Sequence, residues 1–162
     1  MDDKRAVGVS IGIFNDGKTS TYNYGEVEKG TRTLPSHCTL YKIASITKTF
    51  TGTLLAHAVV EQHVKLDDDV RIYLDDEYPN LAFDGQLDKL VHLINHTSRL
   101  PFMLPDRPEL FEHPDPIEVS KMLVHLSQRY TRTNFFEDLH QVQLDTAPGV
   151  AFKYSNAAAQ LL

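Results

Sequence analysis

The residues best suited to do chemistry are Ser45 and Lys48, in the stretch Leu40 to Val60 (LYKIASITKTFTGTLLAHAVV). The uncharged run after Lys48 predicts a helix; if Ser45 opens it, residues three apart share a face, so the Lys48 amine would lie beside the Ser45 hydroxyl. A serine at a helix N-terminus also lies at the positive end of the helix dipole, which favours an anionic nucleophile or a nearby oxyanion. The pair therefore predicts a nucleophile with a proton acceptor beside it.

A simpler interpretation fits the same four residues. Serine is a preferred N-cap, and a lysine one turn later is usually just solvated. A Ser-x-x-Lys pattern is also expected about once by chance in a chain of this length. The spacing of Ser45 and Lys48 needs support from the rest of the chain.

A second pair of polar residues follows the Pro148-Gly149 turn. Tyr154 and Asn156 are two apart on a short extended segment, so a phenol and an amide would point the same way and could meet one ligand. A phenol close to a lysine has its anionic form favoured and can act as a general base. The alternative is a core tyrosine followed by a capping asparagine. Tyr78-Pro79-Asn80 has the same spacing in a loop without the flanking pattern, and we interpret it as chance.

Composition limits the classes of function. The chain has 162 residues, 41% hydrophobic and 23% charged, which is typical of one globular domain with a real core. A net charge of −6 argues against nucleic acid or an anionic membrane as the main partner. No apolar run reaches the ~20 residues of a membrane span, and the first residues, MDDKRAVG, lack the apolar core of a signal peptide. Cys38 is the only cysteine, so no internal disulfide can form and the redox compartment stays undecided.

Metal and nucleotide sites are not indicated, so we expect no metal and no organic cofactor. His92 and His96 are four apart, but Leu93 stands where a metallohydrolase helix would carry glutamate. The Asp67-Asp68-Asp69 run lacks the glycine and the glutamate of a calcium loop, and Asp67 or Asp68 is better explained as the cap of a short helix ending near Leu74. The chain has no glycine-rich phosphate loop.

The predicted elements are a hairpin followed by a mainly helical region. Val7 to Phe14 and Lys18 to Val27 predict two strands around an Asn15-Asp16-Gly17 turn, with residues 30–38 as a loop. Further along the chain, we expect a helix through Leu87 and Ile94 and a loop from Met103 to Pro116. A helix from Asp115-Pro116 to about Tyr130 would bury Val119, Leu123 and Leu126. Two more helices would follow, one over Phe135 to Val142 with Asn134 and Glu137 at its start, and one from Asn156. A helix that starts two turns from the last residue, and a hairpin without partner strands, predict the N-terminal part of a larger domain.

Three segments, in this order, resemble one protein family: Ser45 to Lys48, Leu93 to Pro101 (LINHTSRLP) and Pro148 to Asn156 (PGVAFKYSN). The family is the serine β-lactamase and penicillin-binding-protein superfamily, in its class C β-lactamase-like branch, which includes DD-peptidases and esterases. The resemblance runs from about Val7 to the last residue.

The resemblance implies a role for each candidate residue. Ser45 would be the acylated nucleophile, with its backbone N–H as one oxyanion donor, and Lys48 would accept or relay its proton. Tyr154 would be the partner base, and Asn156 would hold the substrate amide or the lysine. The substrates would be β-lactams, D-amino-acid peptides or esters, and the location would be periplasmic or extracellular; without a signal peptide in this chain a cytoplasmic location stays open.

The implied fold is α+β and β-lactamase/transpeptidase-like. Residues 1–162 would be the N-terminal part of a single domain, with the sheet hairpin and loop in 1–39 and the mainly helical region in 40–162. The remaining sheet strands are missing, and with them the Lys/His-Thr/x-Gly motif that supplies the second oxyanion donor, so we expect weak or absent turnover from the isolated chain. Arg99 stands where the family usually has glycine, which would strain the turn by ~1–2 kcal/mol if its φ is positive.

Two other functions stay open. One is a non-catalytic protein of the same fold that binds cell-wall peptide or a partner. The other is one chain of a split enzyme, whose second chain would supply the missing strands. The presence of Ser45, Lys48, Tyr154 and Asn156 together argues against a decayed, non-catalytic site.

Overall fold

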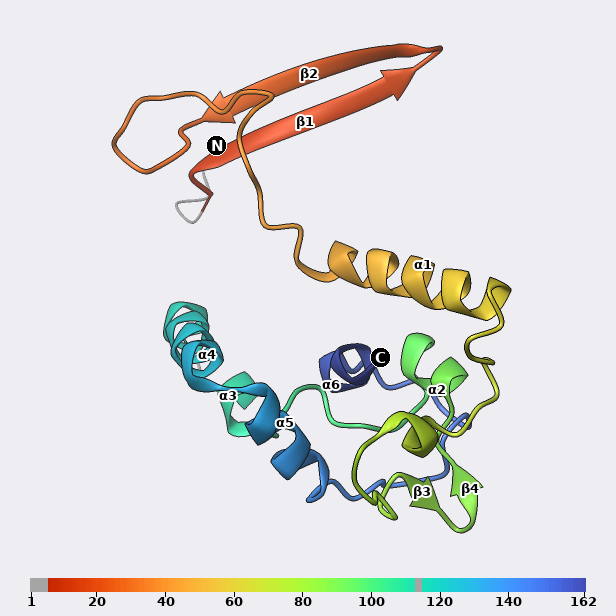
Figure 1. Ribbon diagram of the computed structural model, residues 1–162. Coiled ribbons are helices and arrows are strands. Elements are labelled where there is room, and N and C mark those ends of the chain that lie inside the picture. Colours follow the sequence, from red (N-terminus) through yellow and green to blue (C-terminus); the bar gives the residue numbers. More distant parts are fainter. Residues whose placement is uncertain (1–5, 113–114) are drawn as a thin grey trace. The chain divides into compact units, whose positions relative to one another are not determined.

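The computed structural model describes residues 6–112 and 115–162 (Figure 1). The chain divides into two compact units, Met1–Ala44 and Ser45–Leu162. All four candidate residues belong to the second unit. Among the described residues, no helix combines the length and apolar character needed to cross a membrane.

The first unit contains the predicted hairpin. Strands β1 (Gly8–Asn15) and β2 (Lys18–Gly25) pair antiparallel, with Ile11 opposite Tyr22. The turn between them has φ values of 47° at Asp16 and 75° at Gly17. Two successive positive φ angles match the twist of the flanking strands, which explains why the Asp-Gly pair predicts this turn correctly.

The second unit is mainly helical, with one small hairpin. It contains the 3₁₀ turn η1 (Ala44–Ile46, whose first residue ends the first unit), α1 (Thr47–Val60), η2 (Val70–Tyr73), β3 (Ala82–Phe83), β4 (Gln86–Leu87), α2 (Leu90–Ile94), α3 (Glu109–Glu112), α4 (Pro116–Arg129), α5 (Arg132–Leu139) and α6 (Asn156–Leu161). Strands β3 and β4 pair antiparallel. Helices α2 and α6 lie side by side (Figure 1).

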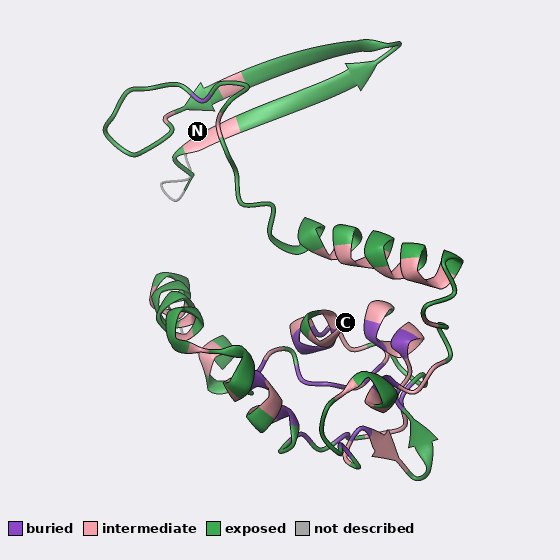
Figure 2. Ribbon diagram, in the orientation of Figure 1, coloured by how far each residue is buried: buried purple, intermediate pink, exposed green. Residues whose placement is uncertain are grey.

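The buried hydrophobic core of the second unit draws residues from α2, α5 and α6 and from the segments between them (Figure 2). Leu93 of α2, Leu139 of α5, and Ala157 and Ala158 of α6 are fully inaccessible to solvent. The two alanines have short side chains, so the α6 backbone can approach its neighbours closely. Because α6 begins at Asn156, this packing also fixes the position of that candidate residue.

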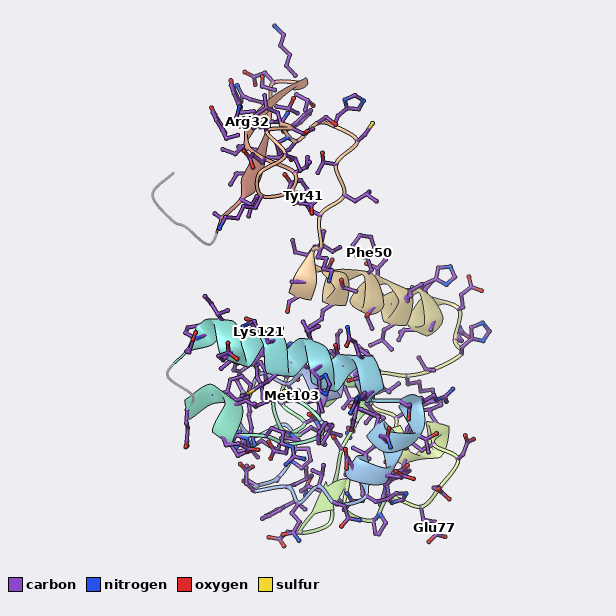
Figure 3. All side chains as sticks on the ribbon, turned by 90° about the vertical axis from the view of Figure 1, so that its left-hand side faces the viewer. Arg32, Tyr41, Phe50, Glu77, Met103 and Lys121 are labelled. Carbon is purple, nitrogen blue, oxygen red and sulfur yellow. The ribbon has the colours of Figure 1, made fainter. Side chains whose placement is uncertain are left out.

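Helix α1 packs over α2 at a glycine. A Cβ atom at Gly52 would lie 3.3 Å from Cδ1 of Ile94, so the two helices approach closely at this position. The apolar side chains of Phe50 (labelled in Figure 3) and Leu54 remain exposed on α1. Lys48, in the first turn of α1, is linked to the first residue of α6 by the hydrogen bond from its amine to Asn156 Oδ1.

Two predicted helix starts are wrong. Asp69, not Asp67 or Asp68, caps η2, and its side chain accepts a hydrogen bond from the Arg71 N–H. Helix α2 begins only at Leu90, because Leu87 pairs with Ala82 in the small hairpin. A helical repeat in the sequence does not reveal this competing strand pairing.

The region after residue 103 also differs in part from the prediction. A short helix, α3, lies within the predicted loop. Asp115 caps α4 as predicted, with its side chain accepting from the Ile117 N–H, but Val119, Leu123 and Leu126 are only half-buried. Helix α5 starts earlier than predicted, at Arg132, because Thr131 and Asn134 form its capping box.

Candidate active site

Ser45 lies in η1, immediately before α1, and is exposed. The N-cap position of α1 is Ile46, and no side chain caps the helix. The Ser45 hydroxyl is therefore not used as a helix cap, which contradicts the simpler interpretation of the Ser-x-x-Lys pattern. Ala44, directly before it, has a φ of 47°, a conformation that costs a residue with a Cβ atom ~1–2 kcal/mol.

The four predicted side chains meet in one place. Ser45 Oγ lies 2.7 Å from Tyr154 Oη. Lys48 Nζ donates to Ser45 Oγ at 3.3 Å and to Asn156 Oδ1 at 2.6 Å. The same amine lies 5.2 Å from the centre of the Tyr154 ring. Residues more than one hundred positions apart in the sequence thus form one connected polar group.

Backbone hydrogen bonds hold the segment that carries Tyr154 and Asn156. The N–H of Gly149 donates to Thr97 O at 2.9 Å, and the N–H of Asn156 donates to Phe102 O at 2.7 Å. Between them, the buried hydroxyl of Ser155 donates to Pro101 O at 2.6 Å and accepts from the Ala158 N–H, capping α6. The residues on either side of this anchored serine are Tyr154 and Asn156, so neither can shift without breaking these contacts.

The surroundings of Tyr154 favour its anionic form. The hydrogen bond with Ser45, followed by the interactions with Lys48, lowers the pKa of the Tyr154 phenol from its usual value. A phenol with a lowered pKa, in contact with a serine hydroxyl, can accept the serine proton.

His96 also lies beside the site, although the sequence patterns did not place it there. Its ring lies 4.4 Å from the Tyr154 ring, between centres, and its Nδ1 accepts the Ser155 N–H at 3.3 Å. Burial, followed by the charge of Lys48, lowers the pKa of His96 and favours the neutral imidazole. The signal available in the sequence is its place in the turn after α2, because its spacing from His92 bears only on a metal site.

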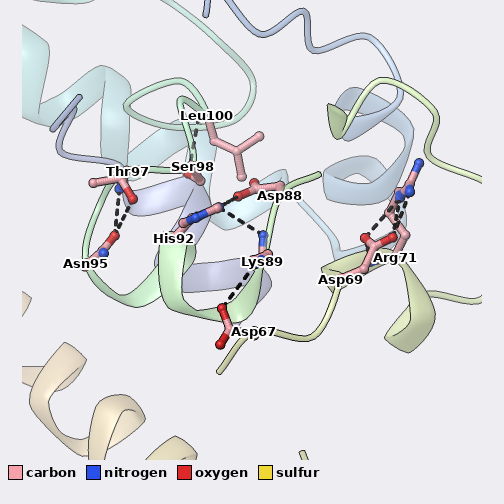
Figure 4. Close-up of polar contacts among 10 residues, drawn as sticks. All are labelled: Asp67, Asp69, Arg71, Asp88, Lys89, His92, Asn95, Thr97, Ser98 and Leu100. Carbon is pink, nitrogen blue, oxygen red and sulfur yellow. Dashed lines mark hydrogen bonds and ion pairs between the residues drawn. The ribbon is translucent and has the colours of Figure 1, made fainter. Parts of the chain in front are cut away.

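The two histidines at helical spacing face different partners. His92 Nδ1 accepts the Lys89 N–H and lies 3.3 Å from Asp88 Oδ1 (Figure 4), whereas His96 Nδ1 faces Ser155. Within residues 6–112 and 115–162, no group of three or more His, Cys, Asp or Glu side chains is placed to hold a metal ion.

Arg99 does adopt a positive φ, 68°, in the turn that precedes Leu100. Its guanidinium forms two hydrogen bonds of 2.8 Å with the Asp145 carboxylate. This paired geometry offsets part of the backbone strain and ties the turn to the segment that leads to Tyr154.

Open space adjoins the site. An apolar cavity of about 480 Å³ lies beside Asn156, between α4 and the loop that contains Met103 (labelled in Figure 3). A second cavity of about 280 Å³ is lined by Lys48 and His96.

A serine beside a lysine and a tyrosine, on a mainly helical unit accompanied by a β-hairpin, defines the class of the β-lactamase-like proteins. The protein-family model described as "Beta-lactamase" matches residues 1–162. The chain therefore belongs to the β-lactamase family, and the predicted family is confirmed.

Individual relatives agree with this assignment. The chain is 35% identical over 105 residues to a "Beta-lactamase" of Providencia stuartii, covering 65% of this chain and 27% of the relative. It is 29% identical over 157 residues to the "D-alanyl-D-alanine-carboxypeptidase/endopeptidase AmpH" of Escherichia coli, covering 97% of this chain and 37% of the relative. The chain thus spans about a quarter to just over a third of the length of these relatives.

A solved structure confirms the predicted fold class. The "Beta-lactamase/D-alanine Carboxypeptidase from Yersinia pestis complexed with citrate" superposes with a TM-score of 0.77 at 27% identity, covering 96% of this chain and 41% of that one. The fold is therefore β-lactamase/transpeptidase-like.

Proposed function

We propose that this chain carries the nucleophile and base of a serine hydrolase that acts through an acyl-enzyme. The observation that carries the proposal is the 2.7 Å contact between Ser45 Oγ and Tyr154 Oη, with Lys48 Nζ bonded to the same serine oxygen. The substrates would be β-lactams, D-amino-acid peptides or esters, in keeping with the names of the relatives and with the family resemblance of the sequence.

The proposed reaction begins with a proton transfer. Tyr154, as phenolate, accepts the Ser45 hydroxyl proton while Oγ attacks the substrate carbonyl carbon. The positive charge of Lys48 stabilises the phenolate. The Lys48 amine is held in place by its hydrogen bond to the neutral side chain of Asn156. The C–N or C–O bond to the leaving group then breaks, and the leaving group takes the proton from Tyr154 Oη. Water, deprotonated by the same phenolate, then attacks the acyl carbon, the bond from this carbon to Ser45 Oγ breaks, and Oγ takes the proton back from Tyr154 Oη.

The oxyanion formed on the way needs hydrogen-bond donors. Ser45 lies in the first turn of η1, where backbone N–H groups have no acceptor within the helix, so its N–H can serve as one donor. Removal of one such donor typically raises the barrier by ~2.7–4 kcal/mol. A second oxyanion donor would come from another segment or chain. We therefore expect the 162-residue chain on its own to turn over substrate weakly.

The direct test is labelling of the intact protein with a fluorescent penicillin and with an activated-ester probe. We expect covalent label on Ser45, and none in the Ser45→Ala variant. Ser120→Ala is the matched control, because Ser120 is exposed on α4 and its hydroxyl donates to Pro116 O within the same helix. Binding of the probe without a covalent adduct would support the non-catalytic alternative and overturn the proposal.

A further inference from the structure

His96 contacts three consecutive residues of the segment that carries the proposed base. Its carbonyl oxygen accepts the Lys153 N–H at 2.8 Å, and its Nδ1 accepts the Ser155 N–H at 3.3 Å. Between these two bonds, the imidazole ring lies against the Tyr154 ring, with 4.4 Å between centres and 35° between planes. The histidine thus fixes both the backbone on each side of Tyr154 and the ring itself.

The imidazole is held in one state and one orientation. Because Nδ1 accepts a hydrogen bond, the ring proton lies on Nε2 and the ring is neutral. The Phe152 ring meets the same imidazole edge-on at 5.9 Å. His96 is half-buried and has a φ of 60°, so its backbone is also committed to this turn.

We propose that His96 is a positioning residue that keeps the Tyr154 phenol oxygen within hydrogen-bond reach of Ser45 Oγ. The inference rests on the proposed function, in which Tyr154 is the base. A displacement of about 1 Å at a reacting group can lower a rate by about a hundredfold. Loss of the ring contact or of the Nδ1 acceptor would allow such a displacement, because the 2.7 Å contact leaves little tolerance.

Three substitutions separate the two contacts. His96→Asn keeps a hydrogen-bond acceptor, because Oδ1 of asparagine is bonded to Cγ as Nδ1 of histidine is. Asparagine also tolerates the positive φ, and the substitution removes most of the ring. His96→Phe keeps a ring and removes the acceptor. His96→Ala removes both. His57→Asn on α1, whose side chain is 72% exposed, is the matched control.

The first readout is the kinetics of Ser45 acylation by a penicillin probe in the intact protein. We expect His96→Ala to lower the acylation rate constant by about ten- to a hundredfold, with the apparent dissociation constant of the probe within about twofold. His96→Asn and His96→Phe should fall between wild type and His96→Ala. A purely structural role would reduce the fraction of protein that labels while the rate constant of the remainder stayed the same.

The second readout is the titration of the Tyr154 phenol by NMR of protein labelled with ¹³C at Cζ of tyrosine, assigned with Tyr154→Phe. The titratable side chains that face the Tyr154 ring are Lys48 from α1 and His96 from the turn after α2. Since the bond with Ser45 is the largest cause of the lowered pKa, we expect the Tyr154 pKa to rise toward its usual value in His96→Ala. The acid limb of the acylation pH profile should move in the same direction.

These readouts distinguish failure of the inference from failure of the proposed function. Absence of label on wild-type Ser45 would overturn the proposed function, while a raised Tyr154 pKa in His96→Ala would still support the positioning role. Wild-type acylation rates and an unchanged Tyr154 pKa in all three variants would overturn the inference. If His96→Ala fails to fold, the same comparison holds for His96→Asn and His96→Phe.

Discussion

Asp88 is the most unusual ionisable group in the described part of the chain, and its replacement by asparagine should stabilise the protein at alkaline pH. Its carboxyl group is fully inaccessible to solvent, and neither oxygen accepts a hydrogen bond from the described residues. His92 Nδ1 lies 3.3 Å from Oδ1 but already accepts the Lys89 N–H (Figure 4). Because the single lone pair of that nitrogen is already used, an ionised Asp88 carboxylate would be buried with no hydrogen-bond donor facing it among the described residues, and burial therefore favours the neutral, protonated acid.

The magnitude follows from the pKa. Burial is the main cause that raises the pKa of Asp88 from 3.8 to about 8. Between these values the folded protein keeps a proton that the unfolded chain releases, so the free energy of unfolding is highest below pH 4 and falls as the pH rises toward 8. At about 1.4 kcal/mol for each pH unit, the loss is on the order of 5 kcal/mol.

The assay is urea denaturation followed by circular dichroism, at several pH values from 4 to 9. Asp88→Asn cannot ionise and is close in shape to the neutral acid, so its stability should match wild type near pH 4 and exceed it by several kcal/mol near pH 8. The control is Asp67→Asn, because the Asp67 side chain is 85% exposed. Equal loss of stability in wild type and Asp88→Asn over this range would refute the reasoning.

Three further predictions concern the turns around the site. Gly149→Ala should destabilise the fold more than Gly85→Ala. Both glycines have a positive φ, 86° and 77°, so the backbone strain is similar in the two variants. A Cβ at Gly149 would lie 2.9 Å from His92 Nε2, whereas a Cβ at Gly85 meets nothing within 4 Å. Thermal unfolding of the two variants should show this difference, and equal shifts would contradict it. Arg99→Gly should change the free energy of unfolding by less than about 1 kcal/mol, because relief of strain offsets loss of the Asp145 pair. Arg99→Ala keeps the strain and should cost about 0.5–1 kcal/mol for the lost pair; a similar loss in both would argue against strain. Arg99 is the main cause that lowers the pKa of Asp145 to about 2, so this pair stabilises the fold above about pH 4 and its contribution is lost as the pH falls toward 2. Denaturation between pH 2 and 5 should therefore show a shallower pH dependence in Asp145→Asn, and an unchanged slope would count against this assignment.

The parts of the fold that the sequence predicts correctly are those with strong local signals. Asp16-Gly17 determines a hairpin turn through its positive φ angles, and Asp115-Pro116 begins α4 through a side-chain cap and a fixed φ. The hydrophobic run after Ser45 likewise predicts α1. Each of these signals acts over a few residues and needs no information about the rest of the chain.

The parts that were missed depend on contacts between distant segments. Residues 87–94 repeat at helical spacing, but the backbone N–H of Asp88 donates to Leu81 O, and this pairing delays the start of α2 until Leu90. The same pairing buries Asp88, although an aspartate in an amphipathic pattern would be placed on the solvent side. No local pattern indicates such a burial.

The candidate site likewise contains residues that sequence patterns identify and a residue whose place depends on contacts between distant segments. Ser45, Lys48, Tyr154 and Asn156 were found by residue type and family pattern, and the structure brings their side chains into contact. The contribution of His96 could not be predicted, because it arises from the pairing of the turn after α2 with the segment before α6. The chemical roles of all these residues stay predictions.

The most direct test of the central claim is peptide mass spectrometry of the intact protein after brief exposure to a penicillin. The account predicts that the peptide containing Ser45 gains the mass of the ring-opened penicillin, and that Tyr154→Phe slows this gain while Ser45→Ala abolishes it. An adduct on another residue, or no adduct in protein that binds the penicillin, would contradict the assignment of Ser45 as the nucleophile.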